Sequence, residues 1–309
     1  MTTTAGTGVG SAAGPWALER RYRYLLRAYP RDYRERFGEE IVATLLETTP
    51  PARSVPSPRE AASLVHGGLR ARAALASEGP PWRDGLHLGV LVVALGTFAT
   101  LLPYAGSIPL WVGLSAATVF AVTYGWVWPA IPLAAVTGGK VAAMALGRPW
   151  LDQTLLPVLP DRFWGGRALY GTGGPIAPMI AYAVLIVGLL VLASSKRPLR
   201  TRSWRWWAVA PLVAGADPAW LDLADASPAT FARVAVEAGL LLLACWAGHV
   251  SGDPRWAVAA GVYLVTQLAV PMENLSLLSR NGLAHWALLA LLTVAATVAP
   301  YQSRRRLQL

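Results

Sequence analysis

Long apolar blocks separated by short polar segments fill the chain from His87 to its end. Eight of them approach the roughly 20 residues that an α-helix needs to cross a bilayer. They lie at about 85–102, 108–127, 130–146, 176–193, 204–221, 230–250, 256–272 and 284–300, and Asp217-Pro218 interrupts the fifth. Only 14% of the 309 residues are charged, against about 25% in soluble domains. We therefore predict an all-α polytopic transmembrane helix bundle of about eight spans with a small N-terminal cytoplasmic helical region.

Positive charge is concentrated in three stretches of the chain, at 20–83, 196–205 and 304–306. Cytoplasmic segments of membrane proteins carry an excess of Lys and Arg. Eight spans with both termini inside place all three stretches in the cytoplasm, whereas seven spans would force one of them outside. The same arrangement places the aspartates between 217 and 225 at the outer face. Both termini are therefore predicted to be cytoplasmic.

The net charge of the chain is +10, and the positions of its cationic residues indicate what they bind. Most cationic residues flank apolar blocks, so we assign them to topology and to contacts with anionic lipid headgroups. The expected partner is the lipid bilayer, and nucleic acid is not expected. Cys245 is the single cysteine and cannot form an intrachain disulfide. The four histidines form no close ligand pair, so neither a metal site nor a cofactor is predicted.

Four segments follow from composition. Residues 1–14 are a polar tail that we expect to be disordered, and 15–80 form a cytoplasmic amphipathic helical prefix. Residues 81–303 form the transmembrane helical domain, and 304–309 form a basic cytoplasmic tail.

Three amphipathic helices are predicted in the prefix, at about 16–28, at about 31–47 and from 57 onward. The Tyr29-Pro30 step ends the first helix, because a residue before proline avoids the helical conformation. Ser57 and Glu60 form a capping-box pattern at the start of the third. The expected apolar faces are Leu18, Tyr22, Leu25 and Leu26 on the first helix, Tyr33, Phe37, Ile41 and Leu45 on the second, and Leu64, Val65 and Leu69 on the third.

Lys140 lies about ten residues into the third predicted span, roughly 15 Å deep at 1.5 Å per residue. A charge at such a depth costs at least about 2.5 to 3.5 kcal/mol. It therefore needs a function, a partner or a route to water. A substrate or proton pathway, a structural ion pair, and a lysine that snorkels to the outer surface all remain open.

Other polar residues of the spans are further candidates for a pathway. Arg233 and Glu237 are four residues apart on one helical face and are expected to form a local ion pair. A sharper hypothesis pairs Glu237 with Lys140 across the bundle. Gln267 and Glu273, with Asn274, either line an outward vestibule or are solvated at the interface. The complete set of candidate substrate or ion pathway residues is Lys140, Glu237, Arg233, Gln267 and Glu273.

The longest predicted outer loop, at about 148–175, contains two aspartates. Asp152 and Asp161 could act as paired carboxylates in acid-base work. A solvated loop is the simpler interpretation.

The stretch RYRYLLRAYP at 21–30, followed by RDYRERFGEE at 31–40, resembles the cytoplasmic prefix of many actinobacterial membrane proteins. Some ABC-transporter permeases of the lipoprotein-release and macrolide-export type carry a similar prefix. The resemblance covers about 20–76 and implies residence in a bacterial plasma (inner) membrane. The large extracytoplasmic domain of those permeases and any ATP-binding motif are missing from this sequence. Tyr33, Arg34, Arg36 and Phe37 are the candidate partner-binding residues, for a cytoplasmic protein or a membrane subunit.

Three classes of function remain open. A transporter or permease-like component is the first prediction, based on the number of spans, Lys140 and the prefix. A membrane-anchored sensor or regulatory protein that acts through its cytoplasmic helices is the second. An intramembrane enzyme is the third, and enzymatic activity is not favoured because the sequence contains no recognisable catalytic constellation.

Overall fold

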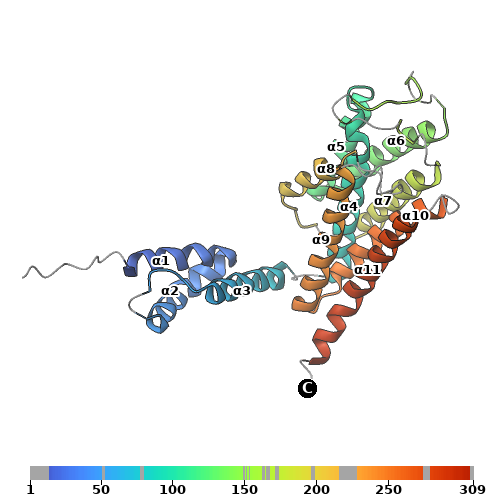
Figure 1. Ribbon diagram of the computed structural model, residues 1–309. Coiled ribbons are helices and arrows are strands. Elements are labelled where there is room, and N and C mark those ends of the chain that lie inside the picture. Colours follow the sequence, from blue (N-terminus) through green and yellow to red (C-terminus); the bar gives the residue numbers. More distant parts are fainter. Residues whose placement is uncertain are drawn as a thin grey trace, which may run out of the picture. The chain divides into compact units, whose positions relative to one another are not determined.

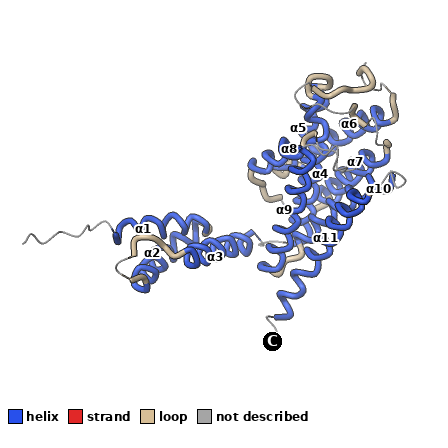
Figure 2. The backbone as a smooth tube through the Cα atoms, viewed as in Figure 1, coloured by secondary structure: helices blue, strands red, loops and turns tan. Residues whose placement is uncertain are grey.

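The computed structural model describes residues 14–50, 53–76, 80–148, 150, 152, 154–161, 164, 168–170, 174–195, 199–215, 228–273 and 279–306. These residues form helices joined by loops, and no strand occurs among them (Figure 2). The chain divides into two compact units, 1–78 and 79–309. The predicted tails fall largely outside the described residues, since 1–13 and 307–309 are not described.

Three α-helices form the N-terminal unit, in agreement with the predicted prefix helices (Figure 1). They are α1 (Gly14–Leu25), α2 (Arg31–Thr48) and α3 (Pro58–Ala76), and the 3-10 turn η1 (Leu26–Ala28) follows α1 directly. The predicted break at Tyr29-Pro30 is present, because Tyr29 adopts an extended conformation and α2 begins after Pro30.

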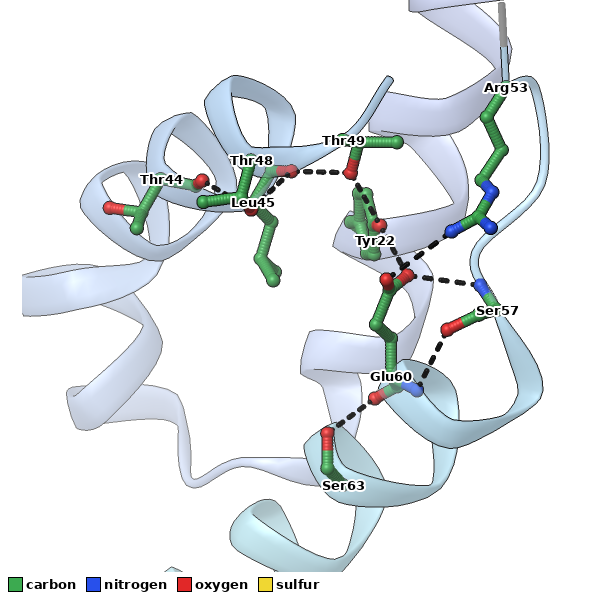
Figure 3. A network of polar contacts seen from close by, with 9 residues as sticks. All are labelled: Tyr22, Thr44, Leu45, Thr48, Thr49, Arg53, Ser57, Glu60 and Ser63. Carbon is green, nitrogen blue, oxygen red and sulfur yellow. Dashed lines mark hydrogen bonds and ion pairs between the residues drawn. The ribbon is translucent and has the colours of Figure 1, made fainter.

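The capping box predicted at the start of α3 is present (Figure 3). The Glu60 amide donates to Ser57 Oγ at 3.2 Å, and the Ser57 amide donates to Glu60 Oε2 at 3.0 Å. The buried Tyr22 of α1 donates its hydroxyl to the same carboxylate at 3.0 Å. The amide hydrogen bond from Ser57, followed by that from Tyr22, holds the pKa of Glu60 below its usual value. The cap therefore also joins α3 to α1.

The apolar stripe predicted on α2 is wrong in its first half. Ile41 and Leu45 pack against the core of the unit, but Tyr33 and Phe37 are exposed by 38% and 44%. Each step of four residues turns a helix about 40° past a full turn, so twelve residues turn it by about 120°. The two aromatic rings therefore rotate out of the core, and Val42 is the buried residue.

A similar correction applies to α3. Leu64 is buried as predicted, whereas Leu69 is 45% exposed. The close contact with η1 is made at Gly68, where a Cβ atom would lie 2.7 Å from the backbone of Ala28. A glycine allows this approach, and a larger residue beside it is left at the surface.

Helices also form the C-terminal unit (Figure 1). They are α4 (Pro81–Leu101), η2 (Leu102–Tyr104), α5 (Pro109–Thr123), α6 (Val127–Ala145), α7 (Ile176–Ala193), η3 (Trp204–Ala208), α8 (Val209–Val213), α9 (Pro228–Ser251), α10 (Arg255–Glu273) and α11 (Arg280–Arg306). Six segments are long and apolar enough to cross a membrane: α4 with η2, α6, α7, α9, α10 and α11. The structure therefore gives six candidate spans among its described residues.

Two of the eight predicted spans differ from the prediction. The second is α5, which has 15 residues and is shorter than a full span. The fifth is a 3-10 segment, η3, that leads into the five-residue helix α8. The rest of that predicted span, at 216–221, lies outside the described residues, as do the aspartates between 217 and 225.

The residues 199–215 run along the length of α4. Arg202 bonds Asp84 near the first turn of α4, Trp207 contacts Phe98, and Gly215 lies against Pro103 just past its end. The 19 residues from Asp84 to Pro103 cover about 28 Å. The thirteen steps from Arg202 to Gly215 cover the same length, which corresponds to a rise of about 2.2 Å per residue. This rise lies between that of an α-helix and that of a β-strand.

The helix α4 is the most buried of the candidate spans, with 67% of its apolar window inside the protein. It packs against α5, α7 and α10, and glycines allow the closest approaches. A Cβ atom on Gly85 would lie 2.4 Å from the carbonyl oxygen of Arg255 on α10. A Cβ atom on Gly188 of α7 would lie 2.5 Å from Val90. Helices α9, α10 and α11 form a second core around Leu241 and Leu289.

We predict that Gly85→Ala destabilises the protein by about 1 to 3 kcal/mol, because the new methyl group overlaps backbone that no rotamer change can move. Thermal unfolding of the full chain in detergent measures this. Gly96→Ala in the same helix is the matched control, because no atom lies within 4 Å of its Cβ position. Equal unfolding temperatures for the two variants would contradict the packing of α4 against α10.

Candidate functional site

Three helices bring a set of polar side chains together inside the second core. Arg233 and Glu237 lie one turn apart on α9, Tyr263 and Gln267 lie one turn apart on α10, and His285 comes from α11. We call these five residues the Glu237 cluster. Sequence reasoning named Arg233, Glu237 and Gln267, and the structure brings all three together.

Glu237 is the centre of the cluster. Its Oε1 atom accepts from Arg233 Nε at 2.8 Å and from the Tyr263 hydroxyl at 2.5 Å. Its Oε2 atom lies 3.3 Å from His285 Nε2. Arg233 also donates to the side-chain oxygen of Gln267 at 3.5 Å. The Glu237 and His285 side chains are 6% and 2% exposed, so both are inside the bundle.

The depth of the cluster follows from its helix positions. Glu237 lies nine residues after the start of α9, about 13 Å along it, and Tyr263 lies ten residues before the end of α10, about 15 Å. His285 is five residues into α11, about 7 Å. The polar atoms therefore lie within the apolar length of the helices.

The cluster has spare hydrogen-bonding capacity. Glu237 Oε2 and His285 Nε2 face each other as an ion pair, so His285 Nδ1 is the ring nitrogen to which the described residues offer no hydrogen-bond partner. Buried polar atoms in proteins are normally satisfied, so Nδ1 marks a place for a water molecule or a polar ligand. Imidazole is the side chain that changes its charge most readily near neutral pH.

Lys140 is fully buried, and the structure gives it a partner that sequence reasoning missed. Its Nζ atom pairs with Asp152 and donates to the carbonyl oxygen of Trp150 at 2.9 Å. It also lies 5.5 Å from the ring centre of Trp111, in cation–π geometry, and the Trp111 Nε1 donates to Asp152 at 2.5 Å. The proposed pairing of Lys140 with Glu237 is wrong, because each has a different counter-ion.

Asp152 is an exposed loop residue, as the solvated-loop interpretation predicts, and it is also the counter-ion of Lys140. Partial burial opposes its ionisation, but bonds from Lys140, Thr154 and Trp111 outweigh that effect and hold the pKa of Asp152 far below its usual value. Asp161 accepts from the amide of Gly106 at 3.1 Å and is not a second carboxylate for Asp152. The sequence did contain a signal for this ion pair, because Asp152 follows Lys140 by only twelve residues, just past the end of α6.

Glu273 has a similar structural role at the end of α10. Its two oxygens accept from the amides of Ile176 and Ala177, both at 2.9 Å, and so cap the start of α7. A negative charge at this position also complements the helix dipole. Glu273 therefore caps α7 and joins it to α10, while Asn274 lies outside the described residues.

A third set of charges lies where α4 and α10 begin. Asp84 pairs with Arg202 and, at 2.8 Å, with Arg255, and Arg255 pairs with Asp253 at 2.9 Å. The Arg255 side chain is 2% exposed. Sequence reasoning read these arginines as topology signals, and it missed that they converge on one aspartate.

The partner-binding candidates lie together on α2. Tyr29, Tyr33 and Phe37 form a ladder with ring centres 5.1 Å apart at each step. Arg36 is exposed beside it and Arg34 is half-buried.

No group of three or more His, Cys, Asp or Glu side chains that could hold a metal ion occurs in the described part of the chain. Comparison of the sequence with protein-family models, and of the chain with curated proteins and with solved structures, finds no match.

We predict that Asp152→Ala lowers the stability of the full chain by roughly 3 kcal/mol, because it leaves the Lys140 charge buried without a counter-ion. Denaturant unfolding in detergent measures the loss. The double variant Lys140→Met/Asp152→Ala is expected to recover most of it. A double variant that is no more stable than Asp152→Ala would contradict the assignment of Asp152 as the counter-ion.

Proposed function

We propose that this chain is a permease-like integral membrane protein and that the Glu237 cluster is its proton pathway. The supporting observation is the convergence of an imidazole, a phenol and a guanidinium from three candidate spans on one buried carboxylate. Ionisable groups at such depth are costly and mark ion or proton pathways by default.

A proton is the species that we propose moves, because an imidazole faces the buried carboxylate. With Arg233 charged and Glu237 ionised, the pair is neutral, and one proton on His285 gives the cluster a charge of +1. Glu237 faces His285 at 3.3 Å, so the imidazolium would have a carboxylate beside it. Arg233 donates to the same carboxylate at 2.8 Å, so the arginine, the carboxylate and the imidazole form one continuous chain of polar groups.

The eight-span topology is part of the proposal. The residues 199–215 run from the beginning of α4 to its end, so the fifth crossing is made by η3 and α8 in place of one long helix. Non-helical backbone is tolerated at membrane depth where protein covers it. With α5 as the second crossing, eight crossings keep both termini and the loop at 196–205 on the cytoplasmic side, as the positive-inside rule requires.

A second candidate is a membrane-anchored regulator that acts through its N-terminal helices, favoured by the separate compaction of the N-terminal unit. The exposed Tyr33 and Phe37 would then contact a cytoplasmic protein.

Proton flux into liposomes that contain the full chain tests the transport proposal. A pH-sensitive dye inside the vesicles reports flux, driven by a potassium diffusion potential. Glu237→Gln is expected to lower the flux by at least about tenfold, because it removes the proton acceptor. Tyr263→Phe is expected to lower it as well, through loss of the hydrogen bond to Glu237.

Tyr301→Phe is the matched control, because Tyr301 is 64% exposed on α11 and lies outside the cluster. Elution as a single folded species must be the same for all variants. Wild-type flux no greater than that of empty liposomes, or full flux in folded Glu237→Gln, would overturn the proposal.

A further inference from the structure

The outward face of α1 and of the turn η1 that follows it carries two exposed aromatic rings and three arginines. Trp16 and Tyr24 are 76% and 67% exposed. At 100° per residue, Arg20 and Arg23 fall on the same arc as these rings, opposite the buried Leu18 and Tyr22. The exposed Arg27 follows in the 3-10 turn η1, with its guanidinium over the Tyr24 ring. We call Trp16, Arg20, Arg23, Tyr24 and Arg27 the α1 face.

The positive charge of this face is only partly neutralised. Arg23 is paired with Glu19 at 2.8 Å and with Glu39 at 3.1 Å. Arg27 lies over the Tyr24 ring at 5.1 Å, and within the described residues no carboxylate pairs with it or with Arg20. Two arginines therefore project from the face with their charge available to a partner.

This combination of residues fits the headgroup region of an anionic bilayer. Trp and Tyr rings are amphipathic and concentrate at membrane–water interfaces. Each Lys or Arg close to an anionic leaflet contributes about 1 kcal/mol of attraction. The N-terminal unit is also tethered to the membrane by a short segment, because only four residues join the end of α3 to the start of α4, the first candidate span.

The other exposed aromatic surface of the unit does not fit a bilayer as well. Tyr33 and Phe37 on α2 are accompanied by the exposed Arg31 and Arg36, but the exposed Glu35 and Glu40 offset their charge. The α1 face retains Arg20 and Arg27 beyond the paired Arg23, so the charge distribution favours the α1 face for lipid.

We propose that the α1 face docks on anionic phospholipid headgroups at the membrane surface, with Trp16 and Tyr24 in the interfacial region and Arg20 and Arg27 on the phosphates. The inference depends on α4 spanning the membrane and is independent of proton transport by the Glu237 cluster.

Electron paramagnetic resonance on the full chain in lipid nanodiscs tests the proposal. A nitroxide is attached at position 24 through Tyr24→Cys in a Cys245→Ala background. Its relative accessibility to oxygen and to a water-soluble nickel complex reports immersion. We expect immersion in discs of phosphatidylcholine mixed with phosphatidylglycerol, and a shift to aqueous exposure in phosphatidylcholine alone.

A charge variant and its control complete the design. Arg20→Gln/Arg27→Gln is expected to reduce the docked population by about an order of magnitude or more, since each arginine contributes about a fivefold preference. Arg59→Gln/Arg70→Gln removes the same charge from exposed positions of α3 and should leave docking unchanged.

Three outcomes would overturn the proposal. A label that is fully water-accessible in both lipid mixtures would show that the face is free. Protection that does not depend on lipid charge would assign the face to a protein contact. Equal loss of docking in the charge variant and in its control would show that the overall charge of the N-terminal unit, and not the α1 face, causes the docking.

Discussion

Asp84 holds together the end of the bundle at which α4 begins. It accepts from Arg202, which lies in the segment after α7, and from Arg255 at the start of α10, while Arg255 is held by Asp253 as well. A charged side chain inside protein must be paired, because its desolvation otherwise costs several kcal/mol. The Asp84–Arg255 pair joins the first turn of α4 to the first residue of α10, and the backbone contact at Gly85 lies beside it.

The other end of the bundle is joined in the same way. Asp152 with Lys140, Asp161 with the Gly106 amide, and Glu273 with the first amides of α7 each use a carboxylate to join segments distant in sequence or to close a loop on a helix. These sets have their hydrogen bonds filled. In the Glu237 cluster the described residues offer no hydrogen-bond partner to His285 Nδ1, but the Asp84 set likewise contains an unfilled nitrogen, Arg202 Nε. The cluster is distinguished by its place, since its residues come from three candidate spans and lie within their apolar length.

Hydropathy predicted the helices well because apolar length is a property of a single segment. Six of the eight predicted spans correspond to long apolar helices, and the capping box of α3 was visible in four consecutive residues. The fifth predicted span is not a continuous helix, since η3 and α8 are two short helical segments that lie along α4. A hydropathy window cannot distinguish a long apolar helix from an apolar segment that is broken and covered.

Side-chain partners were harder to predict because they depend on how the helices meet. The Arg233–Glu237 pair is local and follows from their spacing, whereas Tyr263 and His285 join it only through the packing of α10 and α11. Lys140 was recognised as costly, but its counter-ion was sought on a distant helix when it lay in the next loop. The exposure of Tyr33 and Phe37 likewise follows from helix rotation that a four-residue pattern ignores.

A double-mutant cycle at Asp84 and Arg255 tests most directly the claim that this aspartate organises the bundle. Unfolding free energies of the full chain in detergent are compared for wild type, Asp84→Asn, Arg255→Gln and the double variant. The account predicts a coupling energy of about 1 to 3 kcal/mol, with the double variant more stable than the sum of the single losses implies. Strictly additive losses would show that the two residues act independently and would contradict the account.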